Sequence, residues 1–335
     1  MACHRPFGMT IPPAATNTQD TVPEPTTSMD VTVVIPCYNG ARFLEESLAS
    51  VRNQSAPPRE IIVVDDASQD NSVEIARGLG VQVIALEKNA GPSAARNAGI
   101  RLATSEYIAF LDADDRWRPN HLELVVSAFK PHPEAVLAFG QVAQLGESRR
   151  ITDLHLPNGI PMDLSATLAY ENCVPQSGAI ARREMLLETP YDETMRYAED
   201  YDLWLRLSRR GTMISIDAIT LEWRGHENQA SKAEVRMLDG AWKARLKYIA
   251  ALGDGGEEFF SRIEEAMFRG WESELSDAWY WANGELFDAA VGKAPVVPHS
   301  ERTLRKWKRK RQYLWNISQR LRSNARKLAA TLRRS

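Results

Sequence analysis

Short apolar runs alternate with segments of mixed polarity along roughly the first 120 residues. The runs are rich in β-branched residues and short, which predicts strands buried on both faces of a sheet. Such buried strands are expected at 31–36, 60–64 and 107–111, and a further strand at 81–86. The segments between the strands show helical spacing at about 41–53, 68–80 and 92–103. Strands that alternate with helices predict a parallel sheet with helical crossovers, so the predicted fold class is α/β.

The pattern is less regular beyond residue 119. Helices are expected at about 119–130, 181–187 and 198–210, strands at 135–139 and 213–219, and a loop at 221–231. A helical pattern then continues from 233 to about 292. In the helix at 198–210, Leu203, Trp204 and Leu207 form the predicted buried side, whereas Asp202 is expected to face outward.

Polar residues follow three of the four predicted parallel strands. Tyr38 comes just after the first strand, Asp66 after the second, and Asp112, Asp114 and Asp115 after the fourth. Ligands of open α/β sheets bind beyond the carboxyl ends of the strands. Carboxylate oxygens there suit Mg²⁺ or Mn²⁺, which commonly also binds a diphosphate. The alternative for the acidic segment is a solvated turn in which Asp115 caps the next helix.

Charge is unevenly distributed along the 335 residues, which carry a net charge of −3. Residues 301–335 contain thirteen Lys or Arg and one acid, so the other 300 residues carry −15. The apolar fraction of 44% is ordinary for a globular protein. Three scattered cysteines predict neither a disulfide framework nor a zinc site and favour a reducing compartment.

The two ends of the chain differ from the centre. Residues 1–29 are rich in Pro and Thr without apolar periodicity, which predicts a disordered leader. No apolar run is long enough for a spanning helix or a secretion signal, so the expected location is cytoplasmic. The basic tail at 300–335 contains Trp307 and Trp315 and is typical of a helix on an anionic membrane surface at the inner face. A solvated or disordered basic end is an alternative, and nucleic-acid binding is not expected because nothing else in the chain is basic.

Five ordered motifs together resemble the family 2 glycosyltransferases with a GT-A fold. They are Val-Ile-Pro-Cys-Tyr-Asn-Gly at 34–40, Val-Val-Asp-Asp-Ala-Ser-Gln-Asp at 63–70, Asn-Ala-Gly-Pro-Ser-Ala-Ala-Arg-Asn-Ala-Gly at 89–99, Phe-Leu-Asp-Ala-Asp-Asp at 110–115 and Glu-Asp-Tyr-Asp-Leu-Trp-Leu-Arg-Leu at 199–207. The resemblance implies a GT-A domain over 30–231. A helical extension at 232–299 and the tail at 300–335 would follow it.

The resemblance implies transfer of a sugar from a nucleotide sugar to an acceptor hydroxyl, with inversion. Tyr38 would contact the base, for which its ring face is suited, and Asp66 would accept a hydrogen bond from the base. A carboxylate that accepts an imide N–H favours uracil or thymine, although guanine also offers N–H donors, and the expected donor is UDP-linked. Asp112 would reach the ribose or a metal-bound water. Pro36, Asn39, Arg96, Asn97 and Ala113 complete the implied nucleotide-sugar-binding set. Arg96 has a structural alternative, an ion pair with an acid at a strand end.

The implied metal ligands are Asp114 and His226, which would hold Mg²⁺ or Mn²⁺ on the diphosphate. Asp200 of the Glu-Asp pair would be the catalytic base that takes the proton of the acceptor hydroxyl. A helix N-terminus lowers a carboxyl pKa, so burial or the neighbouring Glu199 must offset that effect. The alternative for the pair is an ordinary acidic cluster at a helix start, and for His226 an ordinary loop histidine.

Three other functions compete with this prediction. One is a nucleotide-sugar-binding protein on the same fold without turnover, which the intact Asp112, Asp114 and Asp200 disfavour. Another is an anionic-membrane-surface-binding protein led by its tail. A nucleotidyltransferase would share the sheet and metal but fits the motif at 199–207 poorly. The acceptor is expected to be a glycan or lipid-linked molecule of polysaccharide or glycolipid biosynthesis, contacted by 141–197 and 221–231.

Overall fold

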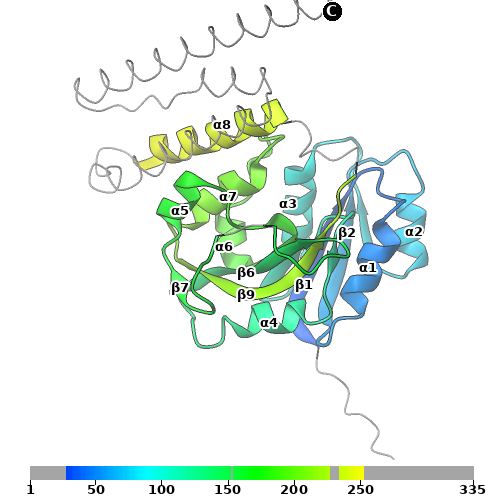
Figure 1. Cartoon of the computed structure of the whole chain (residues 1–335). Coiled ribbons are helices and arrows are strands. Elements are labelled where there is room, and N and C mark those ends of the chain that lie inside the picture. The colour runs from blue at the N-terminus through cyan, green and yellow to red at the C-terminus, as the bar shows by residue number, and fades with distance from the viewer. Residues whose placement is uncertain (1–27, 152–153, 227–233, 253–335) are drawn as a thin grey trace, which may run out of the picture.

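One nine-stranded sheet with helices on both faces forms the described part of the chain (Figure 1). This structure, a computed structural model, describes residues 28–151, 154–226 and 234–252. The predicted α/β class is confirmed. The predictions for the leader, for the chain beyond residue 252 and for the basic tail lie outside the described residues.

The first four long strands are parallel neighbours, as the alternating pattern predicts. The strands are β1 (Met29–Cys37), β2 (Pro58–Asp65), β3 (Gln82–Ala85) and β4 (Tyr107–Phe110), in the spatial order β3-β2-β1-β4. Their connections contain α1 (Leu44–Arg52), α2 (Ser72–Gly78) and α3 (Pro92–Leu102). Cys37 lies opposite Asp65, and Val34 lies opposite Phe110. The carboxyl ends of β1, β2 and β4 therefore meet at one edge of the sheet.

The second half of the sheet is mixed, so the expectation of a mostly parallel sheet holds only for the first half. The strand β8 (Ala179–Arg182) lies antiparallel between β4 and β6 (Ala135–Gln144). The strands that complete the sheet are β9 (Thr212–Trp223), parallel to β6, and the two-residue strands β5 (Arg116–Trp117) and β7 (Pro161–Met162), which pair with β9. Because β9 extends to Trp223, the loop predicted from residue 221 begins three residues later.

Two hydrophobic cores lie on the two faces of the sheet because side chains alternate along each strand. Val34, Ile62 and Phe110 join one core, and Val33 and Val63 join the other. The first core also contains residues of α3, α5 (Ser165–Tyr170), α6 (Arg183–Glu188), α7 (Glu199–Leu207) and α8 (Glu234–Leu252). The second contains residues of α1, α2 and α4 (His121–Ser127). The apolar runs of β1, β4 and the end of β2 are buried on both faces as expected. The edge strand β3 has no buried residue, because no further strand pairs with its outer edge in the described sheet.

A glycine brings α3 close to the sheet. A Cβ atom on Gly99 would lie 2.5 Å from Cγ1 of Val34 on β1, which is too close for any real side chain. The absence of a side chain at Gly99 therefore allows the helix to pack directly on the strand. This contact fixes α3, whose residues Arg96 and Asn97 are predicted site residues, against the centre of the sheet.

Asp202 faces the protein interior, which corrects the expectation that it faces solvent. Its side chain is 2% exposed and accepts hydrogen bonds from Arg206, at 2.9 Å from Nε, and from Lys247 of α8, at 2.5 Å. Lys247 also contacts Asp192 at 2.6 Å. Helical periodicity did not reveal this because the partner helix α8 covers the α7 face that carries Asp202. The ion pairs join α8 to α7, the helix that carries Asp200 in its first turn.

None of the helices within the described ranges has the length and apolar character needed to cross a membrane.

Asp202→Ala should lower the free energy of unfolding by about 1–3 kcal/mol, because it removes the acceptor that joins Arg206 and Lys247 across two helices. Urea denaturation followed by tryptophan fluorescence measures the change. Asp217→Ala is the matched control: Asp217 pairs with Arg150 at the surface and is 46% exposed. It should lose less than about 1 kcal/mol. Equal losses in the two variants would show that Asp202 does not join the helices.

Candidate functional site

The predicted binding residues gather where β1, β2 and β4 end. Tyr38 follows β1 and is 50% exposed, so its ring is available to a ligand. Asn39 is less available: its side-chain oxygen accepts the Gln69 N–H at 2.8 Å, and its own N–H donates to the Ser68 hydroxyl at 2.9 Å. The loops after β1 and β2 are thus bound to each other, with Tyr38 projecting from them. Pro36, within β1, is half-buried.

The Asp66 carboxylate binds the backbone of the loop before α3. It is 4% exposed, and its two oxygens accept the N–H groups of Ala90 at 2.6 Å and Gly91 at 2.8 Å. Each carboxylate oxygen has lone pairs for further partners. Asp66 therefore holds the loop in place, and a nucleobase would be an additional partner.

The Arg96 guanidinium connects two acidic motifs that are far apart in the sequence. Nη2 contacts Asp112 at 2.7 Å, and Nη1 contacts Glu199 at 2.8 Å, while the Arg96 side chain is only 4% exposed. The Tyr191 ring lies 5.5 Å from the guanidinium carbon. Burial alone would lower the pKa of Arg96, but the nearby Asp112, Tyr191 and Glu199 raise it above its usual value. Arg96 thus stays charged and holds the start of α7 beside the end of β4.

Asn97 lies apart from the strand ends. Its side-chain amide donates to the Tyr191 carbonyl at 3.0 Å and to the Glu193 carboxylate at 2.9 Å, and it accepts the Tyr191 N–H at 3.0 Å. These contacts use both ends of a side chain that is only 4% exposed. The geometry gives Asn97 the role of fixing the segment that leads to α7.

Asp114 and His226 meet, as the predicted metal pair requires. The Asp114 Oδ2 and His226 Nε2 atoms are 2.7 Å apart, and both side chains are partly exposed. The Phe43 ring lies 5.2 Å from the imidazole. Burial, together with the charge of Asp112, raises the pKa of Asp114. The described residues contain no cluster of three or more His, Cys, Asp or Glu arranged to hold a metal, so a metal here would depend on ligands from a bound substrate or water.

Asp115 is a buried structural residue and does not cap α4. One oxygen accepts the Ser177 hydroxyl at 2.6 Å, and the other accepts the Arg224 N–H at 3.1 Å. Burial, with the charges of Asp112 and Asp114, raises the pKa of Asp115 well above its usual value. Asp115 therefore anchors both the 3-10 helix η1 (Gln176–Gly178) and the segment after β9 to the acidic loop.

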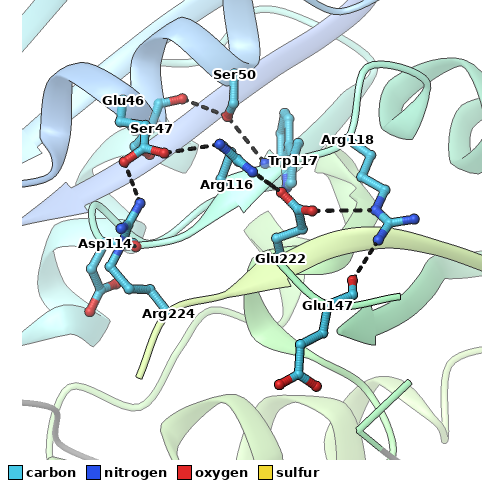
Figure 2. A network of polar contacts seen from close by, with 10 residues as sticks. All are labelled: Glu46, Ser47, Ser50, Asp114, Arg116, Trp117, Arg118, Glu147, Glu222 and Arg224. Carbon is cyan, nitrogen blue, oxygen red and sulfur yellow. Dashed lines mark hydrogen bonds and ion pairs between the residues drawn. The ribbon is translucent and has the colours of Figure 1, made fainter. Parts of the chain in front are cut away.

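A polar network that the sequence did not reveal fixes the segment carrying His226 (Figure 2). Glu46 of α1 contacts Arg116 at 3.0 Å and Arg224 at 2.5 Å. The Arg224 Nε donates to the Asp114 carbonyl at 2.9 Å, and Arg116 contacts Glu222 at 2.5 Å. Glu46 and Arg224 are separated by 178 residues, so no local pattern could have paired them.

Asp200 is the second residue of α7 and points toward the segment after α5. Its Oδ2 accepts a hydrogen bond from Asn172 Nδ2 at 3.1 Å. Burial, and then the charge of Glu199, raise the pKa of Asp200 to about 6. The expected offset to the helix N-terminus is therefore present, and Asp200 can take up a proton near neutral pH.

Backbone strain is concentrated beside three of the predicted site residues, Tyr38, Asp66 and Asp200. Within the described residues, the non-glycine residues with positive φ are Asn39 at 51°, Ala67 at 60° and Ala198 at 54°. Each lies within two residues of Tyr38, Asp66 or Asp200. Such a conformation costs about 1–2 kcal/mol per residue and tends to occur at functional sites. The strain supports a functional role for all three loops.

Comparison with known proteins gives a family for this arrangement. The model for glycosyl transferase family 2 matches residues 32–189. TuaG of Bacillus subtilis (strain 168), whose name assigns it provisionally to teichuronic acid biosynthesis as a glycosyltransferase, is 27% identical over 222 residues. The match covers 63% of this chain and 85% of TuaG.

Two solved structures share the fold. Staphylococcus aureus TarS 1–349 in complex with UDP-GlcNAc superposes with a TM-score of 0.63 at 20% identity, over 80% of this chain and 82% of that one. The mannosyltransferase PcManGT from Pyrobaculum calidifontis, in complex with GDP-Man and Mn²⁺, has a TM-score of 0.53 at 20% identity, over 89% and 88%. At these identities the likeness establishes the GT-A fold alone.

Arg96→Lys should lower the stability of the protein by about 2–4 kcal/mol, because a single buried ammonium group cannot bridge Asp112 and Glu199 and leaves one partly buried acid unpaired. The thermal unfolding midpoint measures the loss. Arg101→Lys is the control, since Arg101 is exposed in the last turn of the same helix, and should change stability by less than about 0.5 kcal/mol. Similar midpoints for both variants would contradict the bridging role.

Proposed function

We propose that this chain, which belongs to glycosyl transferase family 2, transfers a sugar from a UDP-linked donor to an acceptor hydroxyl with inversion at the anomeric carbon. The observation that carries the proposal is the Arg96 bridge, which joins Asp112 to Glu199 at 2.7 and 2.8 Å. It places the acidic loop after β4 beside the helix that carries Asp200 in its first turn. Residues suited to a diphosphate and a residue suited to proton transfer therefore share one site.

The donor's base would lie against Tyr38. An exposed ring is suited to stacking on a base, and the Asp66 carboxylate could accept the imide N–H of uracil. TarS, which has the same fold, is found with UDP-GlcNAc. Asp112, held by Arg96, would bind the ribose, with Ala113 beside it in the same loop.

The diphosphate would bind a divalent metal at Asp114 and His226. The Asp114 carboxylate suits Mn²⁺ or Mg²⁺, and His226 Nε2, which lies 2.7 Å from it in a hydrogen bond, could exchange that contact for the metal. Mg²⁺ typically takes one or two protein carboxylates and completes its shell with phosphates and water. When bound, the metal neutralises charge that develops on the leaving diphosphate. Glu46 and Arg224 support this pair by fixing the segment that carries His226.

Asp200 would act as the base. The acceptor oxygen forms its bond to the anomeric carbon as the bond from that carbon to the diphosphate breaks. The proton of the acceptor hydroxyl passes to the Asp200 carboxylate, and the bonding electrons leave with the diphosphate. TuaG is named for teichuronic acid biosynthesis, which supports a growing polysaccharide as the acceptor.

Asp114→Asn should weaken Mn²⁺-dependent binding of UDP by about tenfold or more, because the metal loses a charged ligand. Calorimetric titration of UDP, GDP and dTDP, each with and without Mn²⁺, measures the effect in wild type and variant. Asp217→Asn, a surface substitution at a residue 46% exposed, is the control. Preference for GDP or dTDP would contradict the uridine assignment, and binding of no nucleotide to folded protein would contradict the donor site.

Asp200→Asn should retain UDP binding but slow the release of UDP from UDP-glucose and UDP-GlcNAc by about 100-fold or more, because an amide cannot accept the proton. The base works when ionised, so the wild-type rate should rise with pH through the Asp200 pKa of about 6. A coupled assay for released UDP between pH 5 and 8 measures both effects. Undiminished turnover in Asp200→Asn would show that another group is the base.

A further inference from the structure

The side chain of Asn172 faces the Asp200 carboxylate from a different element. Asn172 follows α5 by two residues, and its Nδ2 lies 3.1 Å from Asp200 Oδ2. The two residues are 28 positions apart, and none of the five sequence motifs includes Asn172. The contact therefore arises from the fold and has no counterpart in the sequence patterns.

A local turn fixes which end of the Asn172 amide meets Asp200. The Asn172 side-chain oxygen accepts the N–H of Val174 at 3.4 Å, so the donor end of the amide faces the carboxylate. Val174 is 1% exposed and belongs to the core shared with α7. The amide thus cannot reverse without losing both hydrogen bonds.

The two elements are also joined directly. The hydroxyl of Tyr201, the residue after Asp200, donates to the carbonyl of Leu168 in α5. Leu168 is fully buried. This hydrogen bond joins α5, which precedes Asn172, to the first turn of α7, which carries Asp200. It therefore helps to fix the distance between the Asn172 donor and the Asp200 acceptor.

We propose that Asn172 is a positioning residue for Asp200, which holds one carboxylate oxygen in place and favours the ionised form. The inference rests on the proposed function, in which Asp200 is the base. A carboxylate oxygen has more than one lone pair, so the acceptor hydroxyl can still be bound. A hydrogen bond to the charged form lowers a carboxyl pKa, and an amide donor keeps this effect at every pH because it does not titrate.

Other groups around Asp200 shift its pKa, some upward and some downward. Glu199 adds a like charge that raises its pKa, whereas the Arg96 guanidinium and the Tyr201 N–H favour the carboxylate. Tyr191 also lies near Glu199 and Asp200. Burial raises the pKa of the Tyr191 phenol, so the phenol stays neutral. The hydrogen bond from Asn172 lowers the Asp200 pKa and so offsets part of the rise that burial causes. Because Asn172 is neutral, the Asp200 pKa stays high enough for the carboxylate to take up a proton.

Carbon-13 NMR of protein labelled at the Asp carboxyl carbons measures the Asp200 pKa directly, with Asp200→Asn to assign the signal. Asn172→Leu should raise the Asp200 pKa by about half to one unit, because the donor is lost at a partly exposed site. Asn172→Asp should raise it further, since it preserves an acceptor for Val174 but places a second carboxylate beside the first. In Asn172→Leu, the acidic side of the pH–rate profile of UDP release should move to higher pH by the same amount.

The Asn158→Leu variant is the matched control. Asn158 is an exposed loop residue whose side chain accepts the Asp217 N–H at 2.8 Å, and its replacement should leave the Asp200 titration unchanged. If Asn172 only supported its own turn, the Asp200 pKa in Asn172→Leu would match that of wild type, which would overturn the inference. In that event the loss of turnover in Asp200→Asn would still support the base assignment. Undiminished turnover in Asp200→Asn would instead overturn both.

Discussion

The buried guanidinium of Arg96 is the interaction on which the arrangement of this site depends. A charge that is 4% exposed is costly to bury unless it is paired, and Arg96 meets this requirement with Asp112 from one motif and Glu199 from another. The pairing fixes the distance between the loop after β4 and the start of α7. The position of Arg96 is in turn set by Gly99, whose missing side chain lets α3 lie directly on β1.

The helix α7 is held by contacts with α8, and both helices lie beyond the segment matched by the family model. Gly240 of α8 lies so close to the Tyr197 carbonyl that a Cβ atom there would be 2.4 Å from it. Lys247 and Arg245 of the same helix contact Asp202 and the Tyr201 hydroxyl. The strained residue Ala198 lies between these contacts. Packing of α8 thus stabilises a backbone conformation that α7 alone would not favour.

Five aspartates around the site share one chemistry and differ by environment. Asp66 binds two backbone N–H groups, Asp112 pairs with Arg96, Asp114 meets an imidazole, and Asp115 is buried between a hydroxyl and a backbone N–H. Burial and the neighbouring Glu199 raise the pKa of Asp200, and the hydrogen bond from the Asn172 side chain opposes this rise. The fold therefore places identical side chains in environments suited to anchoring, to ligand binding and to proton transfer, because a carboxyl group's pKa follows its neighbours and burial.

The sequence by itself determined the α/β class, the four parallel strands and the polar residues at their ends, because strand and helix periodicities and motif order are local properties. The meeting of Asp114 with His226 followed from the family resemblance and not from any local pattern. Only the tertiary structure decided that β8 inserts antiparallel, that Asp202 is buried, that Asn97 binds Tyr191 and that Asn172 meets Asp200. Each of these depends on contacts between residues distant in sequence or on a partner helix, and a periodic pattern gives the face of one element but not what packs against it.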